Sequence, residues 1–167
     1  HKHLSDQFAA HSIERVYIAV CWNKISPANG KIKSLLSRSN RNRTKMMSSV
    51  SRGKVAITHY KTLENLKNKK NQIVATVLEC RLETGRTHQI RVHLASKKLP
   101  IIGDKSYNPS SNISKNTSQK LMNIIRNFPR QALHSSQLEF NDLGSNKSLS
   151  YCAPIPDDIE NLIKQIK

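Results

Sequence analysis

The sequence has few aromatic residues, few acidic residues and no long apolar segment. Phe, Trp and Tyr make up 5% of the 167 residues, and Asp plus Glu number 11 against 28 for Lys plus Arg. The formal net charge of +17 is far more than solubility requires and favours a polyanionic partner, with nucleic acid first. No run approaches the roughly 18 apolar residues of a membrane span, so we expect no membrane-embedded part.

Cysteine is also scarce, and its spacing carries no motif. Cys21, Cys80 and Cys152 are odd in number, far apart and without a C-x-x-C pair. They signal neither a disulfide framework nor zinc knuckles and are typical of a reducing cytoplasm. The N-terminal HKHLSDQFAA has no starting Met and no hydrophobic signal core, so we expect a cytoplasmic chain whose beginning is missing.

The hydrophobic pattern predicts one α+β domain. Three segments, 16–22, 55–63 and 71–83, are typical of strands, and the lysine-rich LKNKKN predicts a hairpin between the last two. Apolar spacings of three and four predict helices at the N-terminus and over 87–97, 121–128 and 159–166. Because strands and helices do not alternate as β-α-β units, we expect a mainly antiparallel mixed sheet flanked by helices and loops.

The segment from Lys31 to Lys54 contains eight basic residues and no acidic one. We expect an exposed arm or loop that contacts the RNA backbone. A basic loop that is merely solvated is the alternative, and the sequence does not decide between the two. The candidate RNA contacts in it are Arg38, Arg41, Arg43 and Lys45.

Polar residues gather in the stretch RLETGRTHQIRVHLASKKLPIIGDKSYN, residues 81–108. His88 and His93 are five residues apart, about 140° on a helix, so they point in different directions and zinc binding is disfavoured. Arg86 lies beside Gly85 in a strand-to-helix turn, where backbone N–H groups and a guanidinium together suit an anion. That anion is either an RNA phosphate or a protein carboxylate.

Larger parts of the sequence resemble one known family. RLETGRTHQIRVHL followed by LPIIGDKSY resembles the signature of the RluA family of RNA pseudouridine synthases, and RVYIAV resembles its Tyr-bearing strand. RGKVAITHYKTLE resembles the next strand, and RQALHSSQLEF with APIPDDIENLI the closing segment. NRNRTKM, VAITHY and RQALH are most similar to the RluD type, which implies a hairpin of 23S-type large-subunit ribosomal RNA as substrate.

The resemblance implies a reaction and a set of site residues. The family isomerises uridine without a metal or organic cofactor: the N1 glycosidic bond breaks, the base rotates, and C5 bonds to the ribose. Tyr17 matches the tyrosine that lies against the target base, and Arg91 matches the arginine that pairs with the catalytic aspartate. Arg86 and His88 would shape the surrounding RNA surface, whereas Asp104 reads as the hydrogen-bonded carboxylate of a turn. Judged without the resemblance, Tyr17 is a core aromatic.

The family's nucleophile has no counterpart in the sequence. It lies in a segment like H-R-L-D-x-x-T-S-G upstream of the tyrosine strand, and Asp6 belongs to the helix that follows that segment. We therefore expect residues 1–167 to be the C-terminal portion of a catalytic domain, without an S4 domain, monomeric and inactive alone. A nonenzymatic ribosomal RNA-binding protein and a decayed synthase remain alternatives. A helix-turn-helix module is disfavoured because strands and long loops separate the helices.

Overall fold

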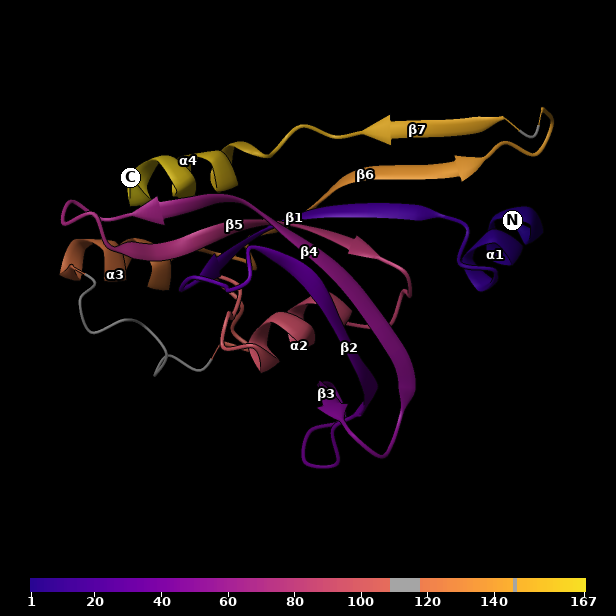
Figure 1. Ribbon diagram of the computed structural model, residues 1–167, viewed down its shortest axis with the longest axis horizontal. Helices are drawn as coiled ribbons and strands as arrows, with labels where there is room; N and C mark the ends of the chain where they lie inside the picture. The colour runs from indigo at the N-terminus through magenta and orange to yellow at the C-terminus, as the bar shows by residue number, and fades with distance from the viewer. Residues whose placement is uncertain (109–117, 146) are drawn as a thin grey trace.

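The computed structural model describes residues 1–108, 118–145 and 147–167. Its centre is a seven-stranded sheet in the order β3-β2-β4-β5-β1-β6-β7, and all neighbouring strands are antiparallel (Figure 1). The α+β prediction is therefore confirmed. The elements are α1 (Lys2–Ala9), β1 (Glu14–Trp22), β2 (Asn29–Arg38), β3 (Met46–Ser49), β4 (Lys54–Lys67), β5 (Ile73–Leu82), α2 (Gln89–Ser96), α3 (Gln119–Arg126), β6 (Leu133–Asn141), β7 (Ser148–Cys152) and α4 (Asp157–Ile166).

The hydrophobic core lies between the central strands and the helices. Trp22 of β1, Leu78 of β5, Leu94 of α2 and Ile159 of α4 are fully buried members of one cluster. α2 packs against β2, β3 and β4, while α3 and α4 contact each other at the end of the sheet that holds the β4–β5 hairpin (Figure 1). The three predicted strands, their hairpin and the three predicted helices other than 87–97 are confirmed.

The prediction of an exposed arm from Lys31 to Lys54 is wrong for most of that segment. Residues 29–38 form β2 and residues 46–49 form β3, so only the loop 39–45, called the basic loop below, and a turn at 50–53 lie outside strands. Ile32 and Leu36 are buried, and Lys31 and Lys33, on either side of Ile32, are exposed. This alternation of period two is a strand signal that the many basic residues obscured.

Helix α2 begins at Gln89, two residues later than predicted. His88 adopts a left-handed backbone conformation with φ 55°, which a helix cannot include. The helix ends at Ser96, before Lys98, which has φ 60°. The residues of the TGRTH segment therefore form a turn that leads into the helix rather than its first turn.

Candidate active site

Tyr17 lies in the middle of β1 on the sheet face that α2 covers. Its Cα partner on β5 is Cys80, which in turn is opposite Tyr60 of β4, so the three side chains share one face. Thr58, two residues before Tyr60, hydrogen-bonds with His93 of α2 at 2.9 Å, which identifies that face as the one under the helix. Tyr17 is half-buried against the core, so its ring is held while part of it stays accessible.

Arg91 of α2 forms a two-point ion pair with Asp104. Arg91 Nε donates to Asp104 Oδ2 and Arg91 Nη2 to Asp104 Oδ1, both at 2.8 Å. The Asp104 side chain is 0% exposed, and its Oδ1 also accepts the backbone N–H groups of Ser106 and Tyr107. Burial alone would raise the pKa of Asp104, but Arg91 and these N–H groups bring that pKa below its usual value. The carboxylate is thus held ionised, and the prediction of a hydrogen-bonded carboxylate in a turn is confirmed.

The segment before Asp104 is attached to the strand that carries Tyr17. Ile102 N–H donates to the carbonyl of Val20 at 2.9 Å, and Ala132 N–H donates to the carbonyl of Ile102 at 2.8 Å. Residues 101–104 therefore lie beside β1, three residues beyond Tyr17 along the strand. Backbone hydrogen bonds to β1 position the Asp104–Arg91 pair relative to Tyr17 before any ligand arrives.

Gly103 makes the turn at Asp104 possible. Its φ is 75°, a conformation that side-chain-bearing residues rarely adopt. A Cβ atom at this position would lie 1.9 Å from the carbonyl oxygen of Arg130. Both the backbone conformation and the close approach therefore require glycine in the segment IIGD.

Tyr107 connects the ion pair to the basic loop. Its ring lies under Arg91, whose Cζ is 4.8 Å from the ring centroid. The Tyr107 hydroxyl accepts the backbone N–H of Met46 at 2.7 Å and is hydrogen-bonded to Nδ1 of His88 at 2.9 Å. One side chain thus contacts α2, the turn before it and the start of β3.

The four candidate RNA contacts of the basic segment have different environments. Arg41 and Arg43 are exposed in the basic loop, and Arg38 at the end of β2 donates Nη1 to the carbonyl of Arg43 at 3.2 Å. Lys45 is half-buried, and its Nζ donates to the carbonyl of Ser106 at 2.9 Å. Arg38, Arg41 and Arg43 are thus all exposed, while Lys45 attaches the loop to the Asp104 turn.

His88 and Arg86 are held in place by neighbouring groups. Burial and the charge of Arg91 lower the pKa of His88, with Asp104 opposing, so its imidazole is neutral at pH 7. Arg86 Nε donates to the carbonyl of Val55 at 3.2 Å, and its backbone N–H donates to Gln89 Oε1 at 3.0 Å. That N–H is therefore not free for an anion, and the guanidinium is engaged through its Nε atom.

Gln89, which organises the TGRTH turn, was not among the predicted site residues. Gln89 is 2% exposed, and besides Arg86 N–H its Oε1 accepts the hydroxyl of Thr84 at 2.8 Å. Its Nε2 donates to the carbonyl of Ile57 at 2.9 Å and to Thr58 Oγ1 at 3.0 Å. A polar residue at the first position of a helix that faces a sheet was the available signal.

His93 is a buried structural residue. Its Nδ1 is hydrogen-bonded with Thr58 and its Nε2 with Ser34 at 3.1 Å, whereas His88 contacts Tyr107. Burial lowers the pKa of His93 to about 4.

Within the described ranges, no group of three or more His, Cys, Asp or Glu could hold a metal ion. No helix in the described parts is long and apolar enough to cross a membrane.

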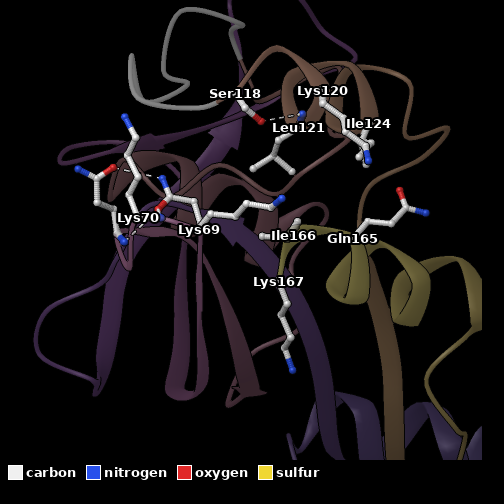
Figure 2. A pocket seen from close by; sticks show the side chains of 11 residues that line it. Lys69, Lys70, Ser118, Lys120, Leu121, Ile124, Gln165, Ile166 and Lys167 are labelled. Atoms are coloured by element: carbon white, nitrogen blue, oxygen red, sulfur yellow. Dashed lines mark hydrogen bonds between the residues drawn. The ribbon is translucent and has the colours of Figure 1, made fainter.

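A cavity of about 550 Å³ lies at the other end of the sheet, between the β4–β5 hairpin, the start of α3 and the end of α4 (Figure 2). Lys69, Lys70 and Lys120 contribute to its rim, and Leu121 and Ile124 contribute apolar lining. None of the predicted site residues lines this cavity. The Tyr17 and Arg91 region is therefore a separate surface.

The chain is similar to known proteins over nearly its whole length. The family model described as RNA pseudouridylate synthase matches residues 1–96. Ribosomal large subunit pseudouridine synthase D of Zymomonas mobilis is 41% identical over 167 residues, which is 99% of this chain and 49% of that protein. The protein of the same name from Xanthomonas campestris pv. campestris is 37% identical over 164 residues, which is 98% of this chain and 47% of that protein. The chain thus spans about half the length of the curated relatives it matches.

Solved structures share the fold. Human RNA Pseudouridylate Synthase Domain Containing 4 superimposes with a TM-score of 0.72 at 20% identity, over 99% of this chain and 66% of that one. Human RNA Pseudouridylate Synthase Domain Containing 1 gives a TM-score of 0.70 at 18% identity, over 99% and 70%. The match of the family model to more than half of the residues and the shared fold show that the chain belongs to the RNA pseudouridylate synthase family.

Proposed function

We propose that the protein containing these 167 residues isomerises specific uridines of large-subunit ribosomal RNA to pseudouridine, and that residues 1–167 form the C-terminal portion of its catalytic domain. The observation that carries the proposal is the arrangement of Tyr17 and the buried Arg91–Asp104 pair beside β1, in a chain of this family. The name shared by the curated relatives supports large-subunit ribosomal RNA as the substrate.

Tyr17 and Arg91 have distinct roles in this proposal. Tyr17 lies against the target base and helps to move a proton while the base changes its point of attachment. Arg91 holds the nucleophilic aspartate ionised by its positive charge. Because Asp104 already occupies Nε and Nη2 of Arg91, the nucleophile would approach the guanidinium from its Nη1 side. Asp104 then acts as a positioning residue that fixes the direction of Arg91.

The RNA is held mainly through its phosphates. The target uridine must leave its stack before its glycosidic bond is accessible, at a cost of about a few kcal/mol. Arg38, Arg41, Arg43, Lys45 and Arg86 supply positive charge beside the site, and the neutral His88 supplies a hydrogen-bonding group. We further propose that the protein acts as a monomer in the cytoplasm and needs neither a metal nor an organic cofactor.

The test starts from the protein isolated from its source. Its intact mass and N-terminal peptides establish which residues precede His1, and its product on large-subunit ribosomal RNA is measured by chromatographic separation of pseudouridine from uridine after nuclease digestion. We expect pseudouridine from a longer protein and none from residues 1–167 alone. RNA binding without pseudouridine formation by the longer protein would instead support a nonenzymatic RNA-binding protein or a decayed synthase.

A further inference from the structure

Arg15 of β1 is a buried arginine whose hydrogen-bonding edge has no partner in the described part of the chain. The residue is only 8% exposed, and its Nε and Nη2 atoms have no hydrogen-bond partner among the residues that the structure describes. Arg91 and Arg130 use the same two atoms to bind the carboxylates of Asp104 and Asp158, at 2.7 to 2.8 Å. Arg15 therefore presents the edge that this protein elsewhere uses for oxyanions.

Arg15 lies close to the candidate active site. It is two residues before Tyr17 on the same strand, so both side chains are on one face of β1. An anion bound to Arg15 would consequently lie beside Tyr17.

Two neighbours hold the guanidinium in this position. The ring of Phe8, from α1, lies over it with the Cζ atom 5.6 Å from the ring centroid. On another side, a Cβ atom at Gly85 would lie 2.1 Å from Nη1 of Arg15, so the glycine of the TGRTH segment provides the space for this side chain. Phe8 is 46% exposed and belongs to a helix of eight residues, so its ring can move without disturbing the core.

The nearby acidic residues are already paired. Glu14 interacts with Arg81 at 3.5 Å, and Glu83 interacts with His59. A buried charge without a partner destabilises a protein, and such groups are kept where function requires them. The net charge of +17 favours a polyanion as the partner, and Tyr17 is predicted to face a flipped-out nucleotide. The phosphate of that nucleotide is therefore the anion that best suits Arg15.

We propose that the Nε and Nη2 atoms of Arg15 bind a backbone phosphate of the RNA next to the target uridine, after the Phe8 ring moves off the guanidinium. This inference rests on the proposed function, because it assigns to the RNA substrate a contact beside Tyr17. Arg15 would thus be an RNA-binding residue outside both the basic loop and the TGRTH turn.

The first test compares Arg15→Met with Lys147→Met, which removes an equal charge from the exposed β6–β7 turn. Affinity for a large-subunit ribosomal RNA hairpin should fall about tenfold for Arg15→Met. The slope of log affinity against log salt concentration should decrease by the amount that about one phosphate contact contributes. The unbound Arg15→Met chain should unfold at the same or a higher temperature, since an uncompensated buried charge is removed. Arg15→Lys should restore the salt dependence but not the full affinity, because lysine lacks the two-donor edge.

Inorganic phosphate provides a second measurement that needs no RNA. Phosphate should raise the unfolding temperature of the wild-type chain more than that of Arg15→Met. Equal shifts in the two proteins, or wild-type RNA affinity in Arg15→Met, would overturn the inference and point to a protein carboxylate as the partner. Failure of the wild-type chain to bind RNA would count against the proposed function instead, and the phosphate measurement would still decide on Arg15.

Discussion

The polar residues of α2 and the residues of the basic loop differ in their exposure to solvent. Gln89, Arg91 and His93, with their partners Thr58 and Asp104, form an α2 cluster that is mostly buried and hydrogen-bonded within the protein. The basic loop exposes Arg41 and Arg43 to solvent. Buried hydrogen-bonded groups keep one geometry, and the protein loses stability when the partner of such a group is removed. Exposed charges attract RNA from a distance, and salt screens them.

Removing Asp104 should produce the largest effect, because it breaks the α2 cluster. Asp104→Ala leaves the Arg91 guanidinium and the N–H groups of Ser106 and Tyr107 without their acceptor. We expect a loss of about 3 to 5 kcal/mol in the free energy of unfolding, measured by urea denaturation. Asp142→Ala, which removes a half-buried carboxylate that accepts hydrogen bonds from the exposed Ser145 in the turn after β6, is the control and should cost much less. Similar losses for the two variants would contradict a special role of the buried pair.

His93 should make the stability of the α2 cluster depend on pH. Its pKa is about 4 in the folded protein, against about 6.5 in an unfolded chain, and its partners Thr58 and Ser34 are neutral hydroxyls. The unfolded state therefore binds more protons between these values, so stability is full above pH 6.5 and is lost as pH falls toward 4. From pH 7 to pH 5 the loss attributable to His93 should be about 2 kcal/mol.

The variant His93→Gln isolates this contribution. Glutamine has no proton to gain in this range, whereas His88, whose pKa is also lowered, titrates in both proteins. The difference in unfolding free energy between wild type and variant should therefore shrink as pH falls from 7 to 5. A difference that is independent of pH would show that folding does not lower the pKa of His93.

The sequence predicted elements whose signal is local. β1, β4, β5, α3 and α4 were predicted because the spacing of their apolar residues is regular over seven or more positions. β2 and β3 were missed because β2 holds as many basic as apolar residues, three of each, and β3 is only four residues long; Ile32 and Leu36 mark the buried face of β2. β6 is half-buried along almost its whole length, so its pattern has little contrast. Its assignment as a strand depends on pairing with β1 and β7.

The site was less predictable than the fold. Tyr17 and Arg91 were singled out only through the resemblance to a family, since a strand tyrosine and a helical arginine are ordinary in such a chain. The partners that give them their geometry are distant in sequence: Asp104 is 13 residues from Arg91, and Thr58 is 35 residues from His93. Hydrogen bonds across such separations depend on the tertiary arrangement and leave no periodic signal.

Tyr107 is the point at which the two regions can be uncoupled. Tyr107→Phe removes the hydroxyl that accepts Met46 N–H and contacts His88, while the ring can still pack under Arg91. We expect a loss of about 1 to 2 kcal/mol in unfolding free energy and faster hydrogen exchange at Met46. Tyr151→Phe, at an exposed tyrosine of β7, should change neither quantity. Unchanged exchange at Met46 would mean that the basic loop is held by other contacts.

The smallest effect on stability should come from the basic loop. Arg41→Ala with Arg43→Ala should change the unfolding free energy by less than about 0.5 kcal/mol, because both side chains are exposed. The salt dependence of RNA binding should nevertheless decrease by about one unit of slope for each arginine. The matched control removes Lys69 and Lys70 from the cavity at the other end of the sheet. If that pair reduces the slope equally, binding follows net charge alone and the basic loop is merely solvated.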